Sequence, residues 1–263
     1  MDSTDIKEMV RNRYGSIAAA ATSCCAPATT SCCSPEDAKA ARMGYSENEL
    51  NAVPEGANLG LGCGNPQAIA ALRPGETLID LGSGAGFDCL LAAKQVGPEG
   101  RVIGVDMTHE MLKKARENAV RVGAGNVEFR LGELEHLPVA DGTGDVIISN
   151  CVINLVPDKA QVFREAFRVL KPGGRLAIAD VVNINPLPQE LATDKALLCG
   201  CVAGAAAPAA IEDLLRSAGF TDIRVEVKPE SREYVASWAA GRGIENYVAS
   251  ANIEARKPAS CCG

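Results

Sequence analysis

From Thr77 onward, short apolar runs alternate with longer amphipathic stretches along the chain. This alternation is typical of βαβ units, in which helices join parallel strands and cover both faces of the sheet. LKPGGR at 170–175 predicts a tight turn whose glycines accept positive φ. We therefore expect an α/β protein with a doubly wound, Rossmann-like sheet. Strands are expected at 77–81, 101–106, 127–132, 145–150, 175–181, 222–228 and 247–257, and helices at 87–96, 109–122, 159–170 and 211–220.

Segments on either side of this alternating region predict appendages. A first helix is expected from Asp5 to Ile17, where Ile6, Met9 and Val10 form an apolar stripe. The small-residue segment after it is expected to be a mobile loop. The expected organisation is an N-terminal helix with a cysteine-bearing mobile loop at 1–58, the main domain at 59–256 with a substrate-side insert at about 183–210, and a cysteine-containing tail at 257–263.

Composition and charge argue against several classes of function. The formal net charge of -7 is unsuited to a polyanionic partner, so no nucleic acid is expected. No apolar run is long enough to span a bilayer, and no membrane partner is expected. The N-terminal residues lack the apolar core of a secretory signal, so we expect a cytoplasmic protein.

Cysteine is the unusual residue of this sequence. Eleven cysteines are many for a reducing compartment, and an odd number fits a disulfide framework poorly. The two histidines nearly exclude an imidazole-rich metal site, and no C-x-x-C spacing supports tetrahedral zinc. The thiols are therefore expected to act as ligands or redox groups.

The strongest local motif is DLGSGAG, which runs from Asp80 to Gly86 between an expected strand and an expected helix. Glycines there let the backbone turn sharply and approach a ligand closely. A plain strand–helix turn and a dinucleotide site share this pattern. Asp106 closes the second strand, where a carboxylate can accept both hydroxyls of a ribose. Together these features indicate a nucleoside cofactor without distinguishing its class.

Three further motifs separate the cofactor classes. GELEHLP after the third strand, SNCVINLVPDK after the fourth and LKPGGRL before the fifth resemble the corresponding segments of class I methyltransferases. The resemblance covers residues 77–182 and implies a class I methyltransferase sheet that binds S-adenosylmethionine. It implies cofactor contacts from Asp80, Gly82, Ser83, Gly84 and Gly86 around the methionine part and ribose, Asp106 and Met107 at the ribose hydroxyls and one adenine face, Glu133, Leu134 and Glu135 at the adenine edge, and Asn150 beneath the methionine end.

Three cysteines are far apart in the chain but follow or precede elements that meet at one end of the sheet. Cys63 precedes the first strand, Cys151 follows the fourth, and Cys201 lies in the insert after the fifth. Core packing is the simpler interpretation of each one separately, because buried free cysteine behaves as a small hydrophobe. Together, in these contexts, they favour a ligand site.

The segments GLGCGNP, DLGSGAGFDC, GVDMT, SNCVINLVPDK and CVAGA together resemble the arsenite S-adenosylmethionine methyltransferases, from Leu59 to Gly204. This resemblance implies that Cys63, Cys151 and Cys201 are the catalytic thiols that bind arsenic. It also implies arsenite and methylarsenite as substrates, a role in arsenic detoxification, and glutathione or thioredoxin as the thiol reductant. A fourth, redox-active thiol is implied in the N-terminal loop, among Cys24, Cys25, Cys32 and Cys33.

Thiol chemistry supports this interpretation from a separate direction. Soft thiolates suit a soft metalloid, and three of them leave trivalent arsenic a lone pair to attack a sulfonium methyl carbon. Two alternatives stay open: a methyltransferase for an organic small molecule with structural cysteines, and a non-catalytic arsenic-sequestering protein. The glycine-rich motif and Asp106 argue against sequestration, because a sequestering protein needs no cofactor.

Overall fold

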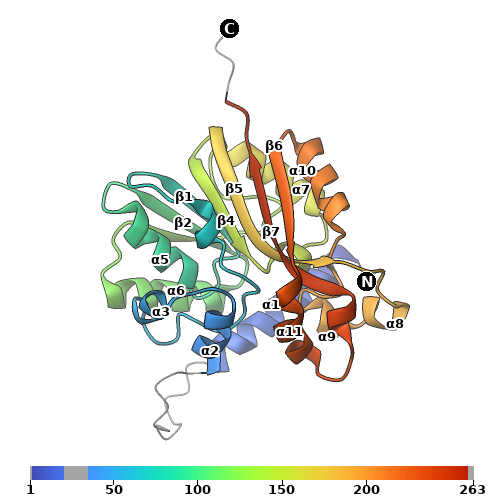
Figure 1. Ribbon diagram of the computed structural model, residues 1–263. Helices are drawn as coiled ribbons and strands as arrows, with labels where there is room; N and C mark the ends of the chain where they lie inside the picture. Colours follow the sequence, from blue (N-terminus) through green and yellow to red (C-terminus); the bar gives the residue numbers. More distant parts are fainter. Residues whose placement is uncertain (1, 21–34, 260–263) are drawn as a thin grey trace, which may run out of the picture.

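The computed structural model describes residues 2–20 and 35–259 (Figure 1). Seven strands form one sheet in the order β3-β2-β1-β4-β5-β7-β6, in which neighbouring strands from β3 to β5 are parallel and β7 is antiparallel to both of its neighbours. The doubly wound α/β sheet predicted from the sequence is confirmed. The strands are β1 (Thr77–Leu81), β2 (Arg101–Asp106), β3 (Val127–Leu131), β4 (Gly144–Asn150), β5 (Leu170–Asn183), β6 (Thr221–Lys228) and β7 (Val248–Arg256).

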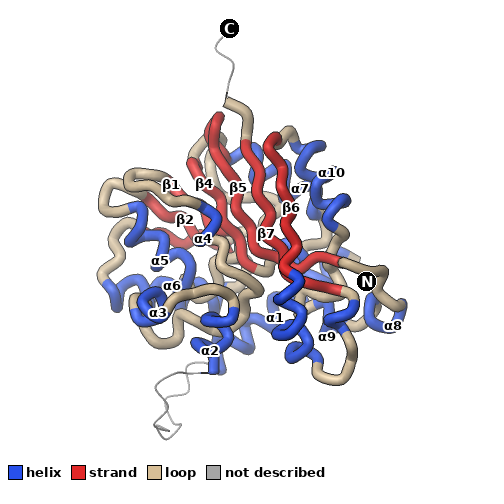
Figure 2. Tube along the Cα trace, viewed as in Figure 1, coloured by secondary structure: helices blue, strands red, loops and turns tan. Residues whose placement is uncertain are grey.

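Helices cover both faces of the sheet, as Figure 2 shows. In β1, Leu78 packs in the cluster with helices α5 (Phe87–Val96) and α6 (His109–Val122), whereas the next residue, Ile79, packs on the other face with α7 (Lys159–Val169) and α10 (Pro208–Ala218). Successive side chains of a strand point to opposite faces. A strand covered on both sides is therefore apolar throughout, which explains the short apolar runs in the sequence.

The predicted turn at LKPGGR is instead an irregularity within β5. Gly144 pairs with Leu170 and Val146 with Arg175, so the register shifts between them. The Gly173 N–H donates to the Lys257 carbonyl at 3.0 Å, and the Lys257 N–H donates to the Gly174 carbonyl at 2.9 Å. Of the two glycines, only Gly173 has a positive φ, of 82°. Pairing with the segment after β7 keeps these residues in the sheet, so the prediction of a separate turn was wrong.

Shorter helices gather at the carboxyl end of the parallel strands, beneath the sheet in Figure 1. The first helix is longer than predicted, and the insert after β5 contains two short helices. Within the described residues, no helix is long and apolar enough to cross a membrane. The predicted mobile loop with its four cysteines, and the tail cysteines Cys261 and Cys262, lie outside the described residues. The remaining α-helices are α1 (Ser3–Ala20), α2 (Pro35–Arg42), α3 (Glu47–Asn51), α4 (Gln67–Ala70), α8 (Gln189–Ala192), α9 (Lys195–Leu198) and α11 (Arg232–Val235).

Candidate active site

The turn after β1 brings three glycines to the carboxyl end of the sheet. Gly82, Gly84 and Gly86 have φ angles of 78°, 51° and 88°, in the left-handed region that residues with a Cβ seldom occupy. A Cβ on Gly82 would lie 2.7 Å from the Val152 side chain, whereas a Cβ on Gly84 would meet no atom within 4 Å. Glycine at these positions lets the backbone itself border an open space.

Gly86 has different neighbours from Gly82 and Gly84. A Cβ on Gly86 would lie 2.9 Å from the ring of Phe129 in β3. Gly86 is the residue before α5, and it does not line the cleft described next. Gly86 packs between α5 and β3, and its contact with the cofactor stays a prediction.

A cleft opens at the strand ends, and residues from the segments after β1, β2, β3 and β4 line it. In doubly wound sheets, ligands bind at the carboxyl ends of the strands. Glu133 is not among the residues that line the cleft, and its carboxylate pairs with Lys7 at 2.7 Å and Arg11 at 3.4 Å. Ten predicted residues do line it: Asp80, Gly82, Ser83, Gly84, Asp106, Met107, Leu134, Glu135, Asn150 and Cys151.

Buried carboxylates border this cleft. Asp106 accepts hydrogen bonds from the backbone N–H groups of Gly84 at 3.0 Å and Thr108 at 2.8 Å. Burial raises the pKa of Asp106, and these hydrogen bonds partly oppose the rise. Burial also raises the pKa of Asp80, with a further contribution from the nearby charge of Asp88. Ligand groups that donate hydrogen bonds or carry positive charge would relieve this cost.

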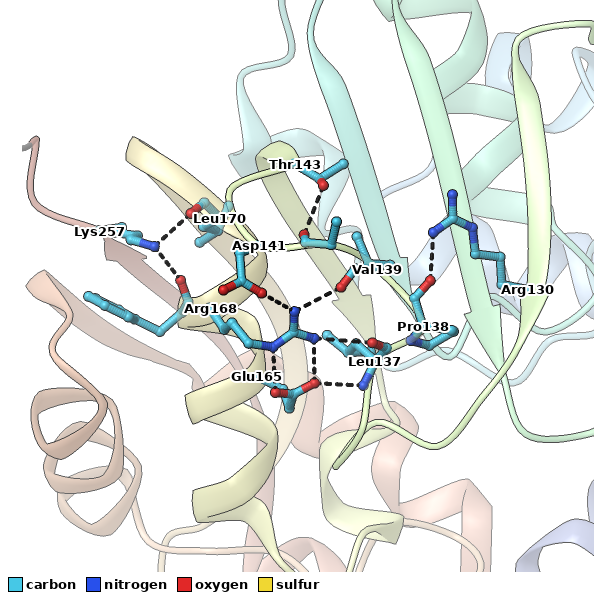
Figure 3. Close-up of polar contacts among 12 residues, drawn as sticks. Arg130, Leu137, Pro138, Val139, Asp141, Thr143, Glu165, Arg168, Leu170 and Lys257 are labelled. Atoms are coloured by element: carbon cyan, nitrogen blue, oxygen red, sulfur yellow. Dashed lines mark hydrogen bonds and ion pairs between the residues drawn. The ribbon is translucent and has the colours of Figure 1, made fainter.

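An ionic network around Arg168 fixes the loop after β3 (Figure 3). Its guanidinium donates to the carbonyls of Leu137 at 3.1 Å and Val139 at 2.9 Å, and it pairs with Glu165 at 2.7 Å. The Glu165 carboxylate accepts the Leu137 N–H at 2.7 Å. The hydrogen bond from Arg168 holds the pKa of Glu165 below its usual value. This clamp from α7 holds the loop that presents residues 134–135 to the cleft.

Helix α1 borders the cleft, which the sequence did not reveal. Lys7 pairs with Glu133 at 2.7 Å and with Glu135 at 3.0 Å. Tyr14, one of the cleft residues, donates its hydroxyl to the Cys199 carbonyl at 3.2 Å. The helix therefore joins the loop after β3 to the cysteine-containing insert.

The structure brings the three predicted cysteines together. Cys151 lines the cleft, and Cys63 and Cys201 are buried next to it. The Sγ atoms of Cys63 and Cys151 lie within 4.8 Å of each other. Cys201 Sγ also lies 2.8 Å from the Cys151 carbonyl oxygen. A buried cluster of three thiols thus stands at one end of the cleft.

Two of these cysteines have an unfavourable backbone conformation. Cys151 has a φ of 58° and Cys201 a φ of 63°. A left-handed conformation costs an L-residue with a Cβ roughly 1–2 kcal/mol. Such conformations persist where the surrounding structure imposes them, often at functional sites.

Cys63 is not among the residues with positive φ, and side chains hold its backbone on both sides. Its N–H donates to Asn150 Oδ1 at 3.0 Å. Its carbonyl accepts from the Ser250 hydroxyl at 2.6 Å and from the Tyr234 hydroxyl. Because Asn150 also lines the cleft, it links the predicted methionine end to the backbone of Cys63.

The surroundings of the thiol cluster disfavour the charged form of its thiols. Burial raises the pKa of Cys63 to about 11. The hydrogen bond with Cys151, together with burial, raises the pKa of Cys201 well above its usual value. A carboxylate oxygen of Asp180 lies within 4.8 Å of the Cys63 and Cys151 sulfurs. Burial raises the pKa of the Asp180 carboxyl to about 6. The cluster therefore suits a ligand that exchanges with protonated thiols.

Comparison with known proteins places this geometry in a family. Residues 72–219 match the family model of a methyltransferase domain. The chain is 52% identical over 266 residues to an arsenite methyltransferase from Halobacterium salinarum, an alignment that covers 98% of this chain and 68% of that protein. The chain belongs to the arsenite methyltransferase family.

Two further arsenite methyltransferase relatives match over shorter parts. An arsenite methyltransferase from Aquipseudomonas alcaligenes is 48% identical over 178 residues, which cover 65% of this chain and 51% of that protein. The crystal structure of an arsenic(III) S-adenosylmethionine methyltransferase from Chlamydomonas reinhardtii shares 34% identity and a TM-score of 0.61, over 86% of this chain and 74% of that one. This chain therefore spans about half to three quarters of the length of these three relatives.

Residues outside the family motifs complete the site. The Tyr45 hydroxyl donates to the Asp88 carboxylate at 2.7 Å and accepts from the Asn150 amide at 3.1 Å. Asp180 accepts the Ile153 N–H at 2.9 Å, which fixes the turn after Cys151. Neither Tyr45 nor Asp180 stands in a recognisable local pattern, because their partners are distant in the chain.

Proposed function

We propose that this chain methylates trivalent arsenic, arsenite first and then methylarsenite, with S-adenosylmethionine as the methyl donor and arsenic detoxification as the result. One observation carries the proposal: three buried thiols from separate segments meet at one end of a methyltransferase cleft. A methyltransferase for an organic molecule has no need of this convergence. The main domain is assigned to residues 59–256, with the insert at 183–210 on its substrate side and the segment 1–58 beside it.

Several features of the cleft fit S-adenosylmethionine. Asp106 is fixed where it can accept ribose hydroxyls, and the carboxyl of Asp80 suits the cationic methionine part. Ser83 Oγ is buried without a hydrogen-bond partner in the described residues, which a bound ligand would supply. When bound, S-adenosylmethionine supplies an electrophilic methyl carbon on a sulfonium sulfur. Leu134, Glu135 and Asn150 line the remaining cofactor surface.

The thiol cluster prepares the nucleophile. Arsenite, As(OH)₃, condenses with the thiols of Cys63, Cys151 and Cys201, forming three As–S bonds and releasing three waters. Arsenic keeps its lone pair, which Cys151 holds towards the cleft. Alignment of this lone pair with the methyl carbon is the main catalytic contribution, because no proton has to be removed in the transfer step. The dry pocket favours a step that disperses charge.

Methyl transfer raises arsenic formally from the trivalent to the pentavalent state. Return to the trivalent state needs two electrons, which two thiolates supply when they form a disulfide. Glutathione or thioredoxin then reduces that disulfide by thiol–disulfide exchange. We place this chemistry in the cytoplasm, whose reducing conditions supply such thiols, and one of the cysteines at 24, 25, 32 or 33 is the candidate redox thiol.

The test is direct. Purified protein is incubated with S-adenosylmethionine, a thiol reductant and arsenite, and the arsenic species are identified by mass spectrometry. We expect methylarsenic first and dimethylarsenic later. A protein that binds S-adenosylmethionine but forms no methylated arsenic would favour an organic substrate instead.

A further inference from the structure

A carboxylate beside the thiols has no direct part in the proposed methyl transfer. One carboxylate oxygen of Asp180 and the Sγ atoms of Cys63 and Cys151 all lie within 4.8 Å of one another. The three residues are 1%, 0% and 7% exposed. Two sulfurs and one oxygen this close, shielded from water, have the arrangement of a coordination site.

Hydrogen bonds fix the orientation of the Asp180 carboxylate. It accepts from the Ile153 N–H at 2.9 Å, the Asn154 side-chain amide at 2.9 Å and the Val181 N–H at 2.7 Å. These contacts hold one of its oxygens within 4.8 Å of both sulfurs.

Trivalent arsenic does not need this oxygen. Three thiolates satisfy arsenic, and its lone pair occupies the fourth direction. Zn²⁺ has no such lone pair and takes four ligands in a tetrahedron, and Cd²⁺ shares its preference for thiolates. Cys201 is the third buried thiol beside these groups, with its Sγ 2.8 Å from the Cys151 carbonyl oxygen, and it supplies a third sulfur when it turns from that carbonyl. We propose that this thiol centre also binds one thiophilic divalent cation, Zn²⁺ or Cd²⁺, through the sulfurs of Cys63, Cys151 and Cys201 and one oxygen of Asp180.

The charge of such a complex is acceptable in a protein. Three thiolates and one carboxylate around a divalent cation carry a net charge of minus two, as in Cys₄ zinc sites. Half-buried Lys159 at the start of α7 is within electrostatic range of Asp180 and Cys201, and its positive charge offsets part of this excess. Binding releases three thiol protons to the solvent. This inference goes beyond the proposed methylation: a bound cation occupies the sulfurs that arsenite requires, so each ligand excludes the other.

The first experiment is a Cd²⁺ titration without S-adenosylmethionine or arsenite. The full-length chain carries serine in place of the six cysteines outside the described residues, so only the five described cysteines can bind. We expect one tight equivalent by thiolate-to-cadmium charge-transfer absorption, and a cadmium-113 NMR resonance typical of mixed sulfur and oxygen ligation. A resonance typical of sulfur alone, or no tight equivalent, would overturn the proposal. The replaced residues are Cys24, Cys25, Cys32, Cys33, Cys261 and Cys262.

Variants in the same background test each ligand. Asp180→Asn should weaken Cd²⁺ binding by at least about tenfold, the lower end of the effect of losing a group around a metal. It should retain arsenite binding, which also shows that the variant is folded. Cys151→Ser should lose binding of both Cd²⁺ and arsenite. Cys89→Ser changes a thiol that is equally buried but bonded to Asp80, and it should keep Cd²⁺ binding. Parent Cd²⁺ affinity in folded Asp180→Asn would remove the carboxylate from the site.

Competition separates this proposal from the proposed function. Arsenite should displace Cd²⁺ from the parent protein one for one, measured as loss of the charge-transfer absorption. If Cd²⁺ binds as expected while the speciation assay finds no methylated arsenic, the methylation proposal alone fails. If arsenic is methylated while Cd²⁺ stays bound in the presence of excess arsenite, the cation lies elsewhere and this proposal fails.

Discussion

The two ends of the cleft place their functional groups by different means. At the cofactor end, Gly82 and Gly84 follow directly after a strand, and their left-handed backbone costs little because they have no Cβ. At the thiol end, Cys151 and Cys201 have the same kind of backbone and carry a Cβ. The cofactor end is thus built from a local motif, whereas the thiol end depends on contacts made across the whole fold.

This difference shows how a common fold acquires a particular chemistry. The thiols belong to an apolar cluster that also contains Leu155, Leu197 and Val202, residues of the turn after β4 and of the insert. Packing of this kind can impose a strained backbone that the local sequence would not adopt. In the proposed function, substrate specificity is therefore a property of tertiary structure, whereas the glycine turn of the proposed cofactor site is encoded in one local motif.

The largest difference in effect between the two ends of the cleft is expected for a substitution of Cys151, which lines the cleft and belongs to the thiol cluster. Cys151→Ser exchanges a soft ligand for a hydroxyl, and arsenic methylation should fall at least about 100-fold because the nucleophile is no longer aligned. Affinity for S-adenosylmethionine should not change, since Gly84 and Asp106 act from other strand ends. Arsenic speciation and calorimetric titration on one preparation measure both quantities.

Cys89→Ser is the control for burying a hydroxyl, because Cys89 is a fully buried thiol outside the cluster. The melting temperatures of the two variants are compared. A Cys151→Ser protein that loses activity only in proportion to lost folded protein would behave as a core variant, and the proposed ligand role would be wrong.

Asp106→Ala tests the opposite end. The ribose hydroxyls lose a charged acceptor, worth roughly 1.5–3 kcal/mol, so affinity for S-adenosylmethionine should fall by about one to two decades. Arsenite binding by the thiols, measured without cofactor, should be retained. Unchanged cofactor affinity in a calorimetric titration would remove Asp106 from the site, and a parallel loss of arsenite binding would contradict the independence of the two ends.

Cys63→Ser tests whether the thiols are equivalent. Methylarsenite already carries one carbon and needs only two thiolates, whereas arsenite can use three. We expect arsenite methylation to fall by about tenfold relative to methylarsenite methylation, the scale of losing one group around a metal. Initial rates with each substrate measure the ratio. An equal loss with both would make Cys63 a ligand in both steps or a structural residue.

The smallest effect concerns backbone strain. At Cys151, glycine should give a more stable protein than alanine by about 1 kcal/mol, because it accepts the left-handed conformation. At Cys63, which lacks a positive φ, alanine should be the more stable by roughly 0.4–1 kcal/mol. Urea denaturation of the four variants gives both differences. If the same substitution, glycine or alanine, gives the more stable protein at both positions, backbone strain does not distinguish Cys151 from Cys63.

Local patterns explain what the sequence could reveal. Every predicted strand was found within a few residues, because runs such as TLIDL are buried on both faces and need no distant partner to be recognised. The glycine turn and Asp106 were also recognised from local patterns, because one directly follows a predicted strand and the other closes one. The segment LKPGGR was misread because its pairing with Lys257 lies far along the chain. The positions of Cys63, Cys151 and Cys201 relative to the predicted strands indicated a shared site, and resemblance to the family motifs assigned that site to arsenic.

Long-range contacts explain what the sequence could not reveal. Lys7 meets Glu133 across 126 residues, and the Tyr14 hydroxyl meets the Cys199 carbonyl across 185. Neither side chain differs from its neighbours on α1 in any way that marks it as part of a site. Asp180 stands within an apolar strand, and only the folded chain shows that it faces two thiols.

The clamp on Cys63 also orders events during synthesis of the chain. The Cys63 carbonyl is held by Tyr234 and Ser250, which follow it by 171 and 187 residues. Ribosomes release the chain from its N-terminus, so the glycine turn and strands β1 to β4 emerge long before these hydroxyls. Ser250 lies in β7, which pairs with both β5 and β6 and is the last of the seven strands to emerge. A nascent chain can therefore form its glycine turn early, whereas its thiol centre is complete only after Ser250 has been synthesised.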